Sequence, residues 1–285
     1  MKKFLALSLA LLMVFSLAAC GTAAEPSDEP SAEASAAPFV EPSAEPVELT
    51  VFAAASMTET LDQIIELYKT VAPNVTITPT YDSSGTLMTQ ISEGAVCDLF
   101  ISAAQKQMNA LDVTQDAEKN PDALDFIDPD TRVNILENKV VLVVPEGNPA
   151  NITKFADIAN AKLVALGNSD VPVGSYSLDI IKYLGLDITA LESAGKITYG
   201  SNVKEVTTQV TECTVDCGIV YATDAYSAGL TVVDTATTDM CKQVIYPAAV
   251  LKASANADAA KAFLDYLTTD EATAVFEKVG FMAVK

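Results

Sequence analysis

The sequence predicts an α/β fold, because strand-like and helix-like segments alternate along most of the chain. Apolar runs of strand length are repeatedly followed by segments whose apolar residues recur at helical spacing. Short clusters of Ser, Asp, Asn, Gly and Pro separate the two kinds of segment. This alternation favours helices packed on a largely parallel sheet.

The N-terminal residues 1–19 have the features of a signal peptide. Lys2 and Lys3 precede an apolar run that is short for a membrane-spanning helix of about 20 residues. The run ends in Leu-Ala-Ala-Cys20, which resembles the lipobox of bacterial lipoproteins and implies that Cys20 is acylated. Residues 20–46 are rich in Ala, Glu, Pro and Ser, so we predict a disordered tether there.

An ordered domain is expected from residue 47 onward. We predict strands over 48–53, 74–81, 98–102, 139–145, 162–166, 217–221 and 243–251. We predict helices over 57–71, 86–93, 176–184, 202–211, 257–267 and 269–278. The β-branched run KVVLVVP at 139–145 is typical of a central strand, and Pro247 interrupts the last strand.

Composition disfavours several functions. The formal net charge is -21, and such a surface repels nucleic acid. The chain has no His, so the commonest general base and the commonest metal ligand are both absent, and we expect nothing in a site to titrate between pH 6 and 8. Arg132 is the only arginine, which disfavours a guanidinium clamp on an anion. An anion would have to be held by neutral, short-range donors.

The cysteines after Cys20 give no metal signature. Cys97 and Cys217 fall at the edges of apolar strands and are expected in the core. Cys213 and Cys241 are less constrained, and the sequence leaves open whether a disulfide forms.

Polar residues open several predicted helices directly after a strand. Ser56, with Glu59 three residues later, has the pattern of a capping box. Segments 82–86, 172–175 and 201–203 occupy similar positions. Each one alone is an ordinary N-cap. Together they would place free backbone N–H groups at the carboxyl ends of strands, where α/β sheets bind ligands and helix N-termini bind anions.

Five stretches of the sequence resemble the molybdate-binding proteins of ABC transporters. They are VFAAASMT at 51–58, SSGTL at 83–87, GAVCDLFISA at 94–103, PVG at 172–174 and GIVYATDA at 218–225. Their order and spacing hold from about residue 47 to residue 281. The resemblance implies a two-lobed fold of the periplasmic-binding-protein type, with two crossover strands and the ligand in the cleft between the lobes. One lobe would comprise 47–137 plus 245–285, and the other 138–244.

The resemblance also implies how an oxyanion is held, with no direct coordination of its metal atom. The implied ligand-binding residues are Ser56 and Ser84 (hydroxyl and amide), Val173 and Val203 (amide), and Tyr221 (hydroxyl). Gly85 stands where relatives often have Ser, which leaves Ser83 as the alternative to Ser84. Asp82 and Asp224 lie close to these positions in the sequence without coinciding with any of them.

We therefore predict an extracytoplasmic solute-binding lipoprotein that captures molybdate or tungstate and delivers it to an ABC transporter permease. It would be a monomer without cofactor or enzymatic activity, at the cell surface or in the periplasm, held to the membrane through lipidated Cys20. Binding of sulfate or another oxyanion is the main alternative, and a surface lipoprotein without a ligand is another. A serine hydrolase is disfavoured, because the chain has no His to activate a serine and no GxSxG motif.

Overall fold

The computed structural model describes residues 45–284, and strands and helices alternate through this range. The predictions for the signal peptide, for Cys20 and for nearly all of the tether lie outside the described residues. Within that range, no helix has both the length and the apolar character needed to cross a membrane.

The first of two sheets has six strands in the order β11-β4-β10-β3-β1-β2. Their bounds are β1 (Val47–Ala54), β2 (Val75–Asp82), β3 (Leu99–Ile101), β4 (Val133–Asn138), β10 (Val244–Val250) and β11 (Met282–Ala283). β1 runs parallel to its neighbours β2 and β3, whereas β10 runs antiparallel to β3 and β4. This sheet is therefore mixed.

The second sheet has five strands in the order β7-β6-β8-β5-β9. Their bounds are β5 (Val140–Val144), β6 (Val164–Gly167), β7 (Ile197–Gly200), β8 (Cys217–Tyr221) and β9 (Thr231–Thr235). β6 is parallel to β7 and β8, and β5 is antiparallel to β8 and β9. The prediction of a largely parallel sheet is wrong, because β10 and β11 in the first sheet and β5 in the second run opposite to the other strands of their sheets.

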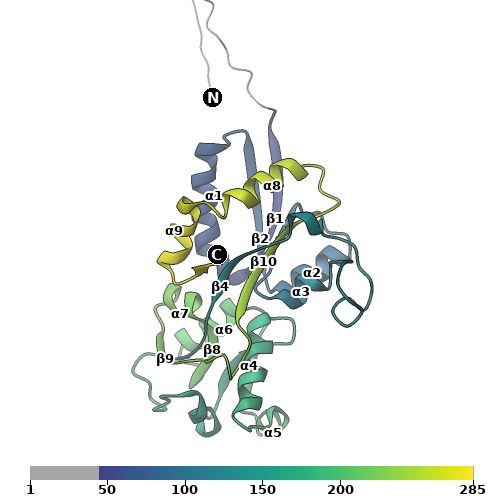
Figure 1. Cartoon of the computed structure of the whole chain (residues 1–285). Helices are drawn as coiled ribbons and strands as arrows, with labels where there is room; N and C mark the ends of the chain where they lie inside the picture. The colour runs from purple at the N-terminus through teal and green to yellow at the C-terminus, as the bar shows by residue number, and fades with distance from the viewer. Residues whose placement is uncertain (1–44, 285) are drawn as a thin grey trace, which may run out of the picture. The chain divides into compact units, whose positions relative to one another are not determined.

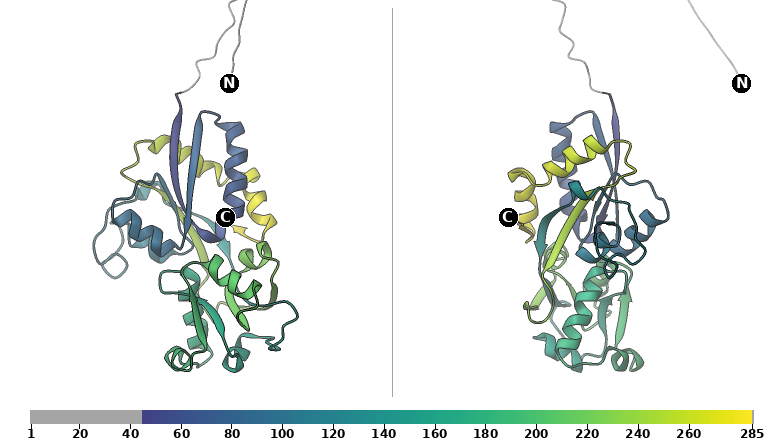
Figure 2. Two further views of the ribbon diagram at one scale, coloured as in Figure 1. Left: turned by 180° about the vertical axis from the view of Figure 1, so that it is seen from behind. Right: turned by 45° about the vertical axis from the view of Figure 1, so that its right-hand side comes forward.

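The helices divide between the two sheets (Figures 1 and 2). Around the first sheet lie α1 (Thr58–Val71), α2 (Ser84–Ser92), α3 (Gln105–Asn109), α8 (Ala257–Tyr266) and α9 (Asp270–Lys278). Around the second lie α4 (Pro172–Tyr183), α5 (Ile188–Ser193), α6 (Val203–Thr211) and α7 (Ala222–Ser227). Short 3-10 turns occur at η1 (Ala55–Met57), η2 (Pro129–Thr131) and η3 (Phe155–Asn160).

Helical periodicity explains how α1 packs. Its buried residues include Leu61, Ile64, Ile65 and Tyr68, which share one face. The ring of Tyr68 lies 4.9 Å from that of Phe263 in α8, so α1 and α8 pack together. This packing fixes the position of the N-terminal end of α1, which follows the end of β1.

The chain passes between the sheets twice. Lys139 alone separates β4 from β5, and residues 236–243 lie between β9 and β10. β1–β4, β10 and β11 thus build one lobe and β5–β9 the other, which confirms the predicted two-lobed α/β fold.

Candidate ligand-binding site

The helix openings singled out in the sequence surround one small cavity between the lobes. Its volume is ≈ 10 Å³, about the room that one water needs. Its lining comprises Ala54, Ala55, Ser56, Asp82, Ser83, Ser84 and Ala103 from the first lobe, and Val171, Pro172, Val203 and Tyr221 from the second. All of these except Asp82 are buried. Four of the five predicted ligand-binding residues therefore line the same cavity.

Ser56 lies in η1 and its Oγ is 2.8 Å from the hydroxyl of Tyr246. The predicted capping box is wrong. α1 begins at Thr58, its N-cap is Met57, and no side chain caps it. A 3-10 turn between β1 and α1 moves Ser56 off the N-cap position, which leaves its hydroxyl available to the cavity. Glu59 accepts hydrogen bonds from Lys204 instead, at 2.8 and 2.7 Å.

Ser83 and Ser84 play different parts at the start of α2. Ser83 is the N-cap, and its Oγ accepts the N–H of Thr86 at 3.1 Å. Ser84 is fully buried, and its Oγ accepts the N–H of Ala103 at 2.9 Å. Because the Ser84 oxygen already accepts a bond, its hydroxyl hydrogen is the group left to donate. Ser83 Oγ also lies 2.8 Å from Thr86 Oγ1, so the Ser83 hydroxyl has two partners at the start of α2 and the Ser84 hydroxyl has one, which favours Ser84 as the ligand-binding serine.

Tyr221 ends β8 and is 1% exposed. Its hydroxyl is buried and has no hydrogen-bond partner among residues 45–284. Burial raises the pKa of Tyr221 well above its ordinary value, so the phenol keeps its proton and can donate. Leaving such a group unsatisfied costs about 1–3 kcal/mol, which a bound acceptor would offset.

The two predicted backbone donors sit at the N-termini of α6 and α4. The Asn202 side chain caps α6 by accepting the N–H of Glu205, and Val203, the first residue of α6, lines the cavity. In α4, Pro172 is the first residue and has no N–H, so Val173 is the first that can donate. Val173 is buried but is not among the residues that line the cavity.

Carboxylates also lie in and beside this cavity. Asp82 lines it and accepts the N–H of Ser83 at 2.7 Å. Asp224, in the first turn of α7, is fully buried, and neither of its carboxylate oxygens has a hydrogen-bond partner among residues 45–284. Lys204 Nζ lies 3.4 Å from Asp224 Oδ1, an ion pair without hydrogen-bond geometry.

Burial raises the pKa of Asp224 to about 7, and Lys204 opposes that rise. Asp224 is not among the lining residues, so the expectation that nothing in the site titrates between pH 6 and 8 stays a prediction. That expectation rested on the absence of His, and the sequence alone does not show that Asp224 is buried.

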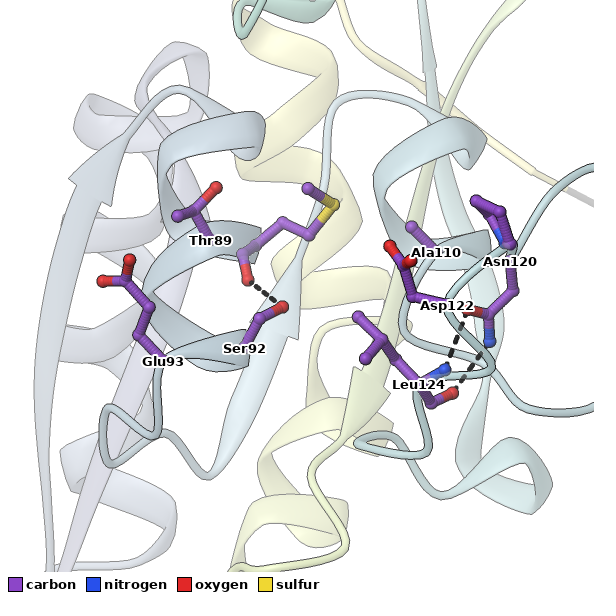
Figure 3. A pocket seen from close by; sticks show the side chains of 9 residues that line it. Thr89, Ser92, Glu93, Ala110, Asn120, Asp122 and Leu124 are labelled. Carbon is purple, nitrogen blue, oxygen red and sulfur yellow. Dashed lines mark hydrogen bonds between the residues drawn. The ribbon is translucent and has the colours of Figure 1, made fainter.

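A larger hollow of about 400 Å³ lies elsewhere on the first lobe, between α2 and the segment up to Leu124 (Figure 3). Asn120 holds this segment by bonding both the N–H and the carbonyl of Leu124. None of the predicted site residues lines the hollow, and two carboxylates, Glu93 and Asp122, do.

The described cysteines contribute no cross-link or metal centre. Cys97, Cys213, Cys217 and Cys241 are free thiols. Cys97 and Cys217 are buried, as predicted, and burial raises the pKa of each thiol to about 12. Among residues 45–284, no cluster of three or more His, Cys, Asp or Glu residues could hold a metal ion.

A buried cavity between two lobes, reached by helix N-termini and neutral hydroxyls, defines a two-lobed solute-binding protein. Residues 49–282 match the family model of the bacterial extracellular solute-binding proteins. The Bacillus subtilis (strain 168) protein YvgL, whose name describes it as an ABC transporter substrate-binding lipoprotein, is 36% identical over 83% of this chain and 87% of its own. The molybdate-binding protein ModA of Escherichia coli (strain K12) is 34% identical over 82% of this chain and 88% of its own. The chain therefore belongs to the bacterial extracellular solute-binding proteins of ABC transporters, in the family that includes the molybdate-binding proteins.

A solved structure agrees with the architecture. The periplasmic molybdate-binding protein of Azotobacter vinelandii superimposes with a TM-score of 0.70 at 21% identity, covering 83% of this chain and 100% of that protein. At this identity the likeness shows the shared fold alone.

Proposed function

We propose that the protein captures molybdate or tungstate outside the cytoplasm and delivers it to an ABC transporter permease. The observation that carries this proposal is the hydroxyl of Tyr221, buried and unpaired among the described residues, at a cavity that Ser84 and the N-terminus of α6 also reach and in whose lining Asp82 is the one carboxylate. The molybdate-binding relatives support the choice of ligand.

The polar groups suit a fully ionised oxyanion. Such an ion offers acceptors only, and Ser84, Val203 and Tyr221 each present a donor toward the cavity. Hydrogen bonds to a charged group are worth about 1.5–3 kcal/mol each, so a few of them in a buried cleft support a Kd below about 1 μM after the cost of association. The site serine Ser56 bonds a tyrosine hydroxyl and no general base, which supports binding over hydrolysis.

Calorimetry with the full chain tests the ligand. We expect molybdate and tungstate to bind with similar submicromolar Kd values, because both are tetrahedral dianions of nearly equal size. Sulfate, a smaller dianion, should bind at least about tenfold more weakly, since a donor site of fixed size loses contacts to it. Sulfate binding within tenfold of molybdate would make this a general oxyanion-binding protein.

The same titration of Tyr221→Phe tests the site. Its affinity for molybdate should fall about ten- to a hundredfold, because one bond to a charged ligand is lost. The ligand-free variant should be at least as stable as the wild type, since the substitution removes an unsatisfied buried hydroxyl. Tyr266→Phe is the control, because its hydroxyl bonds Glu271 in the first lobe and does not line the cavity. An unchanged affinity in Tyr221→Phe would exclude Tyr221 as a ligand-binding residue.

We further propose that Cys20 carries a lipid and that the segment up to residue 46 tethers a monomeric domain to the membrane, as the lipobox resemblance implies. Cell fractionation of Cys20→Ser should find the protein released from the membrane or left unprocessed, because the acylation site is lost. Normal processing with full membrane retention would contradict a lipid anchor.

We also infer that the two lobes move as separate bodies when the cleft opens. One lobe comprises residues 47–137 plus 245–285, and the other comprises residues 138–244.

A further inference from the structure

A chain of buried hydrogen bonds connects Ser56 to both lobes. The hydroxyl of Tyr246, in β10, lies 2.8 Å from Ser56 Oγ and 3.2 Å from Nδ2 of Asn138, the last residue of β4. Asn138 Nδ2 also donates to Thr223 Oγ1 in α7 at 2.9 Å. Tyr246 is 0% exposed and Asn138 3% exposed, so water does not compete for these bonds.

The orientation of the Asn138 amide is fixed by its neighbour. Its Oδ1 accepts the backbone N–H of Lys139 at 2.8 Å. A backbone N–H can only donate, so the oxygen of the amide must face Lys139 and the nitrogen must face Tyr246. The amide nitrogen is a donor, and the Tyr246 oxygen is therefore its acceptor.

This orientation sets the direction of the next bond. The Tyr246 hydroxyl keeps its hydrogen, because burial raises its pKa well above the ordinary value. Among residues 45–284, the acceptor found for that hydrogen is Ser56 Oγ. The Ser56 oxygen thus accepts from Tyr246, and its own hydrogen is left for the cavity. The Ser84 hydroxyl is arranged in the same way, because its oxygen accepts the N–H of Ala103 and its hydrogen is left to donate.

We propose that Asn138 and Tyr246 are positioning residues that hold the Ser56 hydroxyl with its hydrogen toward the cavity, where it can donate to an oxyanion. This inference rests on the proposed function of the same cavity. Because Tyr246 donates to Ser56 Oγ, the Ser56 hydrogen cannot point toward Tyr246, and the hydroxyl is already oriented before the anion binds.

Tyr246→Phe removes the donor to Ser56, so the Ser56 hydrogen is no longer held toward the cavity. The ring should stay in place, because it packs against Phe281 at 5.2 Å and Tyr221 at 6.0 Å between centroids. We expect the molybdate affinity to fall about tenfold. The affinity is measured by calorimetry at pH 7.5.

A double-mutant cycle with Ser56→Ala separates positioning from a general structural effect. If Tyr246 acts through Ser56, then Tyr246→Phe should cost little further molybdate affinity in the Ser56→Ala background. Equal losses in both backgrounds would overturn the inference. If the wild type binds sulfate and not molybdate, the proposed ligand fails, yet the same cycle run with sulfate still tests the positioning role.

Discussion

Replacing Gly85 with Ala is expected to lower molybdate affinity about a hundredfold while leaving the ligand-free protein as stable as the wild type. Gly85, in α2, donates its N–H to the carbonyl of Asp170 in the other lobe at 3.0 Å. A Cβ at this position would lie 2.4 Å from that carbonyl oxygen and 2.8 Å from Asp170 Cα. Because both obstacles are backbone atoms, the lobes must separate to make room.

The size of this effect follows from the cost of overpacking. Forcing an extra carbon into a filled contact costs about 1–3 kcal/mol, and a clash with backbone belongs at the upper end, which is about a hundredfold in Kd. Ala is also the better helix former by about 1 kcal/mol, so a separated, ligand-free α2 should not be weakened.

Gly94→Ala is the matched control. Gly94 has a φ of 91° and nothing within 4 Å of an added Cβ. This variant should lose about 1 kcal/mol of stability through backbone strain and keep its ligand affinity. Calorimetry and thermal unfolding of the two variants should therefore give opposite patterns. Wild-type affinity in Gly85→Ala would show that this contact does not limit closure.

The free energy of unfolding is expected to fall by about 4 kcal/mol as the pH rises from about 4 to about 7 through Asp224 alone, at about 1.4 kcal/mol per pKa unit. The pKa of Asp224 is raised from 3.8 to about 7 in the folded protein. Between these values the folded state holds a proton that the unfolded state has lost, so stability decreases with rising pH. The charged groups that influence Asp224 are Lys204 and Glu59, which also form an ion pair with each other. The hydroxyls of Tyr221 and Tyr246 are the other titratable groups near it.

Asp224→Asn should remove this pH dependence. The variant should match the wild type at about pH 4 and below in urea denaturation and exceed its stability at pH 8, because the amide keeps the shape of the carboxyl group without its buried charge. Asp98→Asn is the control, since Asp98 is also buried but accepts bonds from Thr50 N at 2.7 Å and Ser254 Oγ at 2.5 Å. That variant should lose stability at pH 8. A less stable Asp224→Asn protein at pH 8 would mean that the pairing with Lys204 outweighs burial.

Local pattern was enough to predict the elements that are both long and buried. β8 matches its predicted bounds, 217–221, and every residue in it is buried. α1 begins within one residue of prediction, because its apolar face repeats over fourteen residues. Other elements were not predicted, because their sequence patterns are weaker. β7 and β9 are short and largely exposed or half-buried, so their sequences carry little alternation, and β4 contains a charged residue and two asparagines.

Local motifs were enough to predict that Ser84 and Tyr221 lie near strand ends at one cavity, and their proposed roles came from the resemblance of those motifs. The residues that orient the Ser56 hydroxyl could not be predicted in this way. Tyr246 lies 190 residues from Ser56 and 108 from Asn138, and no local pattern links positions so far apart. The buried state of Asp224 is equally a product of tertiary packing.

The place of β10 in the first sheet has a consequence for the order of folding. β10 lies between β4 and β3, although it follows the whole second lobe in the chain. The second sheet is continuous in sequence from β5 to β9 and can form from local contacts, which is the faster process. The first sheet stays split, with β4 and β3 unjoined, until residues 244–250 are available. A chain emerging N-terminus first, from a ribosome or across a membrane, therefore has no finished ligand cleft until nearly all of it has been released.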